Sequence, residues 1–406
     1  MDVQSGDNGM SSGNGTGGES SEAIIGGGSR EDANGKLKQQ DEDIGEPMSL
    51  VDDVSTEYFE SYEDLNVHRL MLQDAARTNA YQTAITDTQN LFKDKVVMDV
   101  GAGTGILSLF CAKAGAKKVY AVEASGLAKT LPQIFSKNGF SDVVTVIHSR
   151  VEDIQTLPEN AVDIIVSEWM GFYLLHESML ESVLYARDTF MKPGGLMYPN
   201  SAQLYAAPCQ IPDLWKEHGE FWTSQSHYGF DLSPFGNIAK NRQSPVVETI
   251  TSDGLMADPQ LLFDLNLQTI SSSSLEVFKD RRFFTMDQTG DMHAVCLWFT
   301  CTFPVVPGKE PVELSTAPWS DKTHWKQTLI LLPDKLEFEE GDITGWEISL
   351  EKASLIKGSR SYRIHYQCLG DDDEHPVPCE CGAVKCEIIK HYMTQSNQTN
   401  EPDIDE

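Results

Sequence analysis

Two glutamates, Glu168 and Glu177, lie in one short apolar segment that reads S-E-W-M-G-F-Y-L-L-H-E-S from Ser167 to Ser178. Carboxylates held away from water are costly unless a cation pairs with them, and this segment contains no lysine or arginine. We therefore expect the two acids to bind the cation of a substrate. The alternative is that they are two unrelated acids on the protein surface.

An apolar run, A-V-D-I-I-V from Ala161 to Val166, precedes this segment. Such a run predicts a strand of a parallel sheet that is buried on both faces. Ligands of open α/β sheets bind beyond the carboxyl ends of the strands. The position of the two glutamates therefore favours a binding site over a surface charge pair.

The stretch from Lys95 to Ser125 predicts a strand, a glycine turn, a helix and a second strand, which is a nucleotide-type βαβ unit. The turn brings the backbone at Gly101 and Gly103 close to a ligand, and Glu123 can accept both ribose hydroxyl hydrogens. These features suit NAD as well as S-adenosylmethionine. The turn reads G-x-G-x-G and has Ile106 where a dinucleotide site needs glycine, which favours S-adenosylmethionine because it has no pyrophosphate.

With D-K-T-H-W-K-Q-T from Asp321 to Thr328, these segments make residues 55 to 390 resemble the protein arginine N-methyltransferases. The motifs that carry the resemblance are D-V-G-A-G-T-G-I-L-S from Asp99, V-Y-A-V-E-A-S from Val119, S-E-W-M-G from Ser167, L-L-H-E-S-M-L from Leu174, and L-S-T-A-P from Leu314 ahead of T-H-W-K-Q from Thr323. The resemblance implies methyl transfer from S-adenosylmethionine to arginine side chains of proteins.

In this family the two glutamates hold the target guanidinium, so Glu168 and Glu177 are the expected catalytic acids. Hydrogen bonds to them would draw positive charge toward the bound nitrogens and leave the remaining terminal nitrogen richer in electrons. The resemblance also assigns His324 and its partner Asp74 to the site, beside the target arginine. Whether this pair relays a proton or only positions the substrate stays open.

The family pattern further places His68 and Arg77 at the methionine end of the cofactor, with Arg77 pairing its carboxylate. Without the resemblance, Arg77 would be interpreted as a solvated helix charge and Glu152 as a surface acid. The residues expected to bind S-adenosylmethionine are His68, Arg77, Gly101, Gly103, Glu123 for the ribose and Glu152 for the adenine amino group.

Tyr62, Met71 and Trp325 match positions that line the arginine pocket in the family, and a methionine there accompanies asymmetric dimethylarginine as the product. The resemblance thus implies a type I enzyme, although Tyr62 and Met71 could also be ordinary core residues. One departure follows His68, where the family usually carries two acids and this chain has Arg69 and Leu70. We expect that difference to affect cofactor affinity or the order of the N-terminal helix.

The chain is acidic, with 62 acidic and 31 basic residues and a formal net charge of −31. This charge disfavours nucleic acid as a direct partner. It would attract arginine-rich segments such as histone tails or glycine-arginine repeats, and salt should weaken that attraction. An acidic balance also serves solubility alone in many proteins.

The composition changes along the chain and predicts four parts. Residues 1–50 hold 11 of the 31 glycines and no aromatic residue, which predicts a disordered tail, and nothing in it resembles a signal peptide. Residues 51–198 should form the N-terminal helices and an α/β Rossmann-like cofactor domain. Residues 199–395 alternate in short apolar segments, as in the mostly antiparallel β-barrel domain of the family, and 396–406 form an acidic tail.

An aromatic-rich piece at about 210–237 interrupts the strand pattern and resembles the helical dimerisation arm of the family. Family members form head-to-tail homodimers through this arm, so a homodimer is expected. The alternative is a monomer in which Trp215 and Trp222 fold back locally.

The eight cysteines include no C-x-x-C pair, so a zinc ribbon or thioredoxin-type site is not indicated. Four cysteines lie close together in the sequence, and we interpret them as strand cysteines of a reducing compartment without a metal, with a structural metal as the alternative. These four are Cys368, Cys379, Cys381 and Cys386.

No apolar run approaches the roughly 18 residues that span a bilayer, so we expect a soluble protein without membrane contacts. The resemblance implies action in the nucleus, where histones are substrates, with the cytosol as a second location. Two other functions remain open: a scaffold or co-regulator that binds arginine-rich partners without turnover, and a small-molecule methyltransferase of the same fold.

Overall fold

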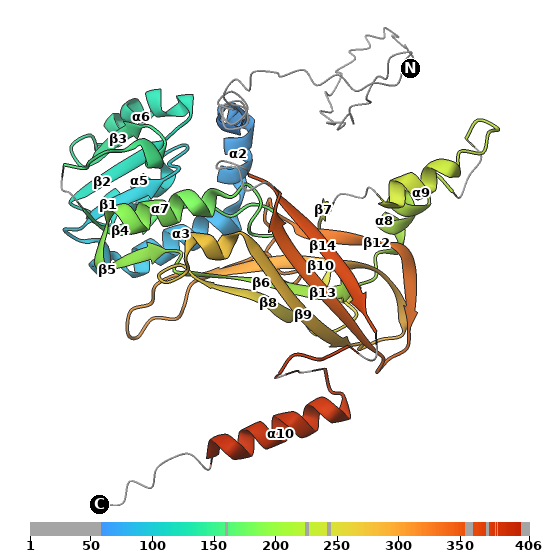
Figure 1. The fold of residues 1–406 in the computed structure, drawn as a ribbon. Helices are drawn as coiled ribbons and strands as arrows, with labels where there is room; N and C mark the ends of the chain where they lie inside the picture. The colour runs from blue at the N-terminus through green and yellow to red at the C-terminus, as the bar shows by residue number, and fades with distance from the viewer. Residues whose placement is uncertain are drawn as a thin grey trace, which may run out of the picture. The chain divides into compact units, whose positions relative to one another are not determined.

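The computed structural model describes residues 58–158, 161–223, 227–241, 245–353, 360–370, 373–377, 379 and 381–398 (Figure 1). The predicted N-terminal tail and the last residues of the predicted acidic tail lie outside the described residues.

Helices precede the first strand and carry part of the site. Residues 58–61 are helical, and α2 (Leu65–Gln73), α3 (Ala75–Asp87) and α4 (Gln89–Phe92) follow. Asp64 caps α2 by accepting from the amide of Asn66, and Asp74 caps α3 by accepting from the amide of Arg77. These caps satisfy amides that a helix start leaves unpaired, and they fix where each helix begins.

A five-stranded parallel sheet forms the first domain, in the order β3-β2-β1-β4-β5. Its strands are β1 (Val96–Val100), β2 (Lys118–Glu123), β3 (Val144–His148), β4 (Val162–Val166) and β5 (Met191–Tyr198). Helices α5 (Ile106–Lys113) and α7 (Met179–Phe190) contact this sheet, and α6 (Leu131–Lys137) and the short 3₁₀ helices η1 (Gly126–Lys129) and η2 (Val151–Asp153) lie in the connections (Figure 1). All five residues of β1 are buried, as expected for a strand covered on both faces.

The order of the strands brings the predicted site together. β1 lies between β2 and β4 and pairs with both in parallel, with Val100 beside Val122 and Asp99 beside Val166. The glycine turn, Glu123 and the segment that holds the two glutamates therefore all begin at the same edge of the sheet.

The second domain is barrel-like and antiparallel, as the sequence predicts. One sheet has the order β7-β12-β10-β6-β8 with β11 paired to β10, and a second has the order β14-β13-β9. The strands are β6 (Ser201–Cys209), β7 (Val246–Glu248), β8 (Gln260–Asn266), β9 (Val277–Thr285), β10 (Gly290–Thr302), β11 (Glu313–Ser315), β12 (Gln327–Phe338), β13 (Ile343–Lys352) and β14 (Tyr362–Leu369), with η4 (Ser252–Gly254) and η5 (Ser272–Leu275) between strands.

Helical segments interrupt this domain where the arm is predicted. They are α8 (Pro212–Trp215), the π-helix η3 (Lys216–Glu220) and α9 (Pro234–Asn241). The side chain of Trp215 is buried, and its Nε1 donates to the carbonyl of Leu332 at 3.1 Å. Phe221, Tyr228 and Phe230 are exposed.

A helix after the last strand was not expected. α10 spans Val384–Gln398 and so continues across the predicted boundary between 395 and 396. Among the described helices, none is long and apolar enough to cross a membrane.

Candidate active site

A cavity of about 280 Å³ lies at the carboxyl ends of β1, β2 and β4. Asp74 is the only predicted site residue that does not line it. The predicted residues on its wall are Tyr62, His68, Met71, Arg77, Gly101, Gly103, Glu123, Glu152, Glu168, Glu177, His324 and Trp325.

Glu168 has a cationic partner within the chain, which lies outside the segment from Ser167 to Ser178. Arg77 donates from Nε to Oε2 of Glu168 at 2.9 Å, and its Nη2 lies 2.7 Å from the same oxygen. Both side chains are about nine-tenths buried. Burial lowers the pKa of Arg77, but the Glu168 carboxylate outweighs burial, so the pKa of Arg77 lies above its ordinary value.

Glu177 is held by tyrosines. Tyr62 Oη donates to its Oε2 at 2.5 Å, and Tyr58 Oη donates to the same oxygen at 3.1 Å. Burial is the main cause that raises the pKa of Tyr62 well above its ordinary value, followed by the neighbouring Tyr58 and then by the charge of Glu177, and burial also raises the pKa of Tyr58. Both phenols therefore stay protonated and act as donors. Glu177 has φ of 76°, which places it in the sharp turn before α7.

The two carboxylates share one arrangement. In each, the contacts from the chain fall on Oε2, and no hydrogen bond to Oε1 occurs within the described part of the chain. A carboxylate offers about four acceptor positions, so Oε1 of Glu168 and Oε1 of Glu177 can both accept from a further donor. Two such oxygens on one cavity wall suit a planar cation with several N–H groups.

Asp74 joins the two domains. Its Oδ1 caps α3 through the amide of Arg77, while Oδ2 accepts from the backbone amide of His324 at 2.8 Å and lies 2.7 Å from Nδ1 of that histidine. Burial raises the pKa of Asp74, but these hydrogen bonds outweigh burial and bring it below its usual range. The structure thus brings together two residues that are 250 positions apart, as the resemblance implies.

Comparison with known proteins gives the family. Residues 97–195 match a methyltransferase domain, and residues 200–371 match the arginine methyltransferase oligomerization subdomain. The chain is 39% identical over 310 residues to protein arginine N-methyltransferase 1 of Saccharomyces cerevisiae, which covers 76% of this chain and 87% of that protein. It is 40% identical over 331 residues to protein arginine N-methyltransferase 6 of Danio rerio, covering 80% and 93%. This chain belongs to the protein arginine N-methyltransferase family.

Solved structures of the family agree with this fold. The Trypanosoma brucei PRMT1 enzyme-prozyme heterotetrameric complex with AdoHcy aligns with a TM-score of 0.70 and 34% identity over 79% of this chain and 97% of that one. The crystal structure of PRMT6-SAH aligns with a TM-score of 0.63 and 31% identity over 75% and 100%. The protein is therefore an S-adenosylmethionine-dependent protein arginine methyltransferase.

The residues of this arginine methyltransferase fit that cofactor. Oε2 of Glu123 accepts from the amide of Gly103 at 2.7 Å and Oε1 accepts from the amide of Ser125 at 2.8 Å, which fixes the carboxylate and leaves acceptor capacity for two hydroxyls. Gly101 and Gly103 have φ of 75° and 52°, a backbone conformation that residues with a side chain rarely adopt. The turn therefore favours glycine at both positions and lets the cavity reach the backbone.

The other predicted cofactor residues take definite positions. Oε1 of Glu152 accepts from Ser182 Oγ at 2.6 Å, which orients the carboxylate on the cavity wall. His68 is buried, with Nε2 2.7 Å from the carbonyl of Tyr62. Leu70, the departure from the family pattern, is half exposed at the cavity rim.

Tyr58 and Arg360 also line the cavity, and no local sequence pattern indicates either of them. The Arg360 guanidinium lies over the Tyr58 ring at 3.7 Å, and Nη1 donates to the carbonyl of Glu177 at 3.1 Å. Arg360 comes from the barrel-like domain, 183 positions from Glu177, and only the folded chain reveals their contact.

Proposed function

We propose that this protein methylates arginine side chains of histone tails and other arginine-rich proteins, giving monomethylarginine and then asymmetric dimethylarginine. The observation that carries the proposal is the pair of carboxylate oxygens, Oε1 of Glu168 and Oε1 of Glu177, on the wall of the cofactor cavity. The strongly acidic chain supports a cationic substrate, and Met71 on the same wall supports the asymmetric product.

The carboxylates would act by binding and polarising the guanidinium. S-adenosylmethionine, when bound, supplies an electrophilic methyl group on a sulfonium. A guanidinium is a poor nucleophile because its lone pairs are delocalised. Hydrogen bonds to Glu168 and Glu177 would hold two of its nitrogens and concentrate positive charge there, so that the remaining terminal nitrogen becomes the better nucleophile.

His324 would receive or guide the proton that the methylated nitrogen loses. Because Asp74 Oδ2 lies 2.7 Å from Nδ1, the neutral ring carries its hydrogen on Nδ1 and its lone pair on Nε2. That lone pair could accept a proton in the cavity. The alternative, that His324 only positions the substrate, predicts no change in the pH dependence of turnover when it is replaced.

The test is methylation of an arginine-rich histone-tail peptide with labelled S-adenosylmethionine, followed by mass spectrometry that separates symmetric from asymmetric dimethylarginine. Glu177→Gln keeps an oxygen for the two tyrosines but places an amide NH₂ toward the guanidinium donors. Leaving a buried charge unpaired costs about 3 to 5 kcal/mol, so turnover should fall by about a hundredfold or more. Cofactor affinity should stay within about twofold, because Glu177 makes no contact with the glycine turn.

The matched control is Glu310→Gln, which removes the same charge from an exposed residue and should leave turnover unchanged. If the turnover of Glu177→Gln stays within about tenfold of that of the natural protein, the proposed role of the carboxylates is contradicted. Cofactor binding without any methylated product would favour the scaffold. Symmetric product would contradict the role given to Met71.

The same proposal includes a homodimer and action in the nucleus on proteins of transcription regulation. The exposed rings of Phe221, Tyr228, Phe230 and Phe235 support the dimer, because a monomer would leave them in water. Sedimentation of the natural protein and of Phe230→Asp tests it: a dimer that dissociates in the variant is expected, and a monomeric natural protein would contradict it.

A further inference from the structure

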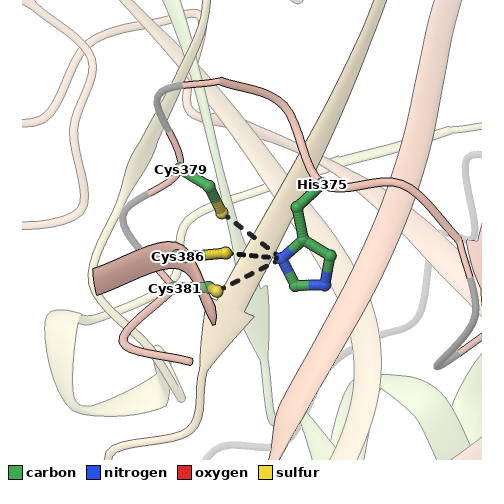
Figure 2. A group of neighbouring side chains, drawn as sticks. All are labelled: His375, Cys379, Cys381 and Cys386. Atoms are coloured by element: carbon green, nitrogen blue, oxygen red, sulfur yellow. Dashed lines mark hydrogen bonds between the residues drawn. The ribbon is translucent and has the colours of Figure 1, made fainter. Parts of the chain in front are cut away.

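Three cysteines and one histidine meet beyond the end of β14, away from the cofactor cavity. Nδ1 of His375 lies 3.5 Å from Sγ of Cys379, 3.3 Å from Sγ of Cys381 and 3.3 Å from Sγ of Cys386. Figure 2 shows the three sulfur atoms gathered around this one ring nitrogen. All four ligand atoms lie within 4.8 Å of one another. The interpretation of these cysteines as strand residues is therefore wrong for three of them, and only Cys368 lies in a strand.

Hydrogen bonds do not account for this arrangement. A ring nitrogen has either one hydrogen or one lone pair, so Nδ1 can serve one thiol well and not three. A disulfide would join two of the sulfurs and leave the third, and all three cysteines are free. Four soft or borderline donors pointing to one centre are instead the arrangement that a tetrahedral metal ion satisfies completely.

The distances agree with a tetrahedral site. With metal–sulfur bonds of about 2.3 Å and a metal–nitrogen bond of about 2.05 Å, tetrahedral angles put nitrogen and sulfur about 3.6 Å apart. The observed separations are 3.3 to 3.5 Å. Thiolate-rich tetrahedral sites select Zn²⁺ among the common divalent ions.

The surroundings support a built site. The three cysteine side chains are buried, with exposed fractions of 6%, 1% and 3%. The His375 ring stacks on Phe283 of β9 with centroids 3.5 Å apart, and Thr285 of the same strand donates to the carbonyl of Cys381. Cys386 lies in the first turn of α10, so the four residues join α10 to the sheet β14-β13-β9.

We propose that His375, Cys379, Cys381 and Cys386 bind one structural zinc ion that fixes α10 to β9. Four protein ligands leave no open position, and none of them lines the cofactor cavity, so the ion holds structure and takes no part in methyl transfer. Binding releases the three thiol protons, and three thiolates with one Zn²⁺ and a neutral histidine carry a net charge of −1. Lys385, which lines the pocket beside His375 and Cys386, offsets that charge.

The sequence pattern H-x₃-C-x-C-x₄-C does not contain the C-x-x-C spacing that marks common zinc modules. Cys386 lies in α10, whereas His375, Cys379 and Cys381 lie between β14 and α10. Only the folded chain shows that these four residues meet.

The experiment measures metal per chain in the full-length protein, with any polyhistidine tag removed. The protein is equilibrated with Zn²⁺, freed of loose metal by dialysis, and analysed by plasma mass spectrometry. We expect about one zinc per chain in the natural protein, and almost none in Cys381→Ser or Cys386→Ser. The matched control Cys368→Ser alters the exposed strand cysteine and should keep about one zinc.

A second set of measurements uses the natural protein and so does not depend on whether the variants fold. Cobalt substituted into the natural protein should show thiolate-to-cobalt absorption and a tetrahedral spectrum, and X-ray absorption of the zinc form should show three sulfur neighbours at about 2.3 Å and one nitrogen at about 2.0 to 2.1 Å. Chelation should then expose α10 to protease while cofactor affinity stays within about twofold. A natural protein without zinc, iron in its place, a disulfide among the three cysteines, or zinc with no sulfur neighbour would each overturn the proposal.

Discussion

Replacing either member of the buried pair Arg77 and Glu168 should lower the melting temperature of the protein. Both side chains are about nine-tenths buried and meet at 2.7 and 2.9 Å, so replacing one leaves the other as a buried charge without its partner. That loss costs about 3 to 5 kcal/mol. At roughly 2 °C per kcal/mol for a body of this size, Arg77→Met and Glu168→Gln should each lower Tm by about 6 to 10 °C.

The double variant carries neither charge. It should therefore be no less stable than the worse of the two single variants, because replacing both partners removes the unpaired charge. The test is a double-mutant cycle: Tm is measured by calorimetry, without cofactor, for the natural protein, the two single variants and the double variant. Arg281→Met is the matched control, because Arg281 pairs with Glu347 at 2.7 Å but is 42% exposed, and such pairs contribute about 0 to 1 kcal/mol.

Two outcomes of this double-mutant cycle would contradict the reasoning. If the two single shifts are as small as that of Arg281→Met, the pair is not buried in solution. If the shift of the double variant equals the sum of the single shifts, the two residues are not coupled. Cofactor affinity of the same proteins adds a separate test: Arg77→Met should bind S-adenosylmethionine more weakly than Glu168→Gln does if Arg77 also pairs the cofactor carboxylate.

Three further predictions concern single side chains. Burial raises the pKa of Asp99 to about 7, so its contribution to folding is present below about pH 4 and is lost as the pH rises through 7. Asp99→Asn, which can still accept from Ser108, should raise Tm at pH 8 and have no such effect at pH 4, and equal shifts at both values would contradict the raised pKa. Tyr62→Phe removes the 2.5 Å hydrogen bond to Glu177 and should lower kcat by about tenfold or more with little change in Tm; an unchanged kcat would mean that Tyr58 alone suffices. Glu123→Gln offers one acceptor oxygen to two amides and should weaken cofactor binding by about 10 to 100-fold in calorimetry, whereas unaltered affinity would remove Glu123 from the cofactor site.

The fold of the cofactor domain could be predicted because the sequence patterns that indicate its strands and turns are local. The run Ala161–Val166 predicts a buried strand and β4 is one, and the glycine turn from Gly101 joins β1 to α5 as expected. Each signal lies within about ten residues and depends on backbone geometry that glycine or β-branched residues favour.

The pairing of side chains was not predictable from spacing. Glu168 meets Arg77 across 91 positions, and Arg360 meets Glu177 across 183. Charge alone allows many such pairs, and burial decides among them only in the folded chain. The contact between Asp74 and His324 was foreseen through the family resemblance and not from their positions.

The hydrogen bond from Trp325 Nε1 to the carbonyl of Met170, at 2.8 Å, links the two domains beside the contact of His324 with Asp74. Residues 323–326 form a tight turn between β11 and β12, closed by the amide of Lys326 on the carbonyl of Thr323. The turn therefore carries two residues of the cavity wall, His324 and Trp325, and each is tied to the first domain by its own contact. The shape of the substrate side of the cavity thus depends on how the two domains are joined, and a substitution at Asp74 would alter it without touching the substrate.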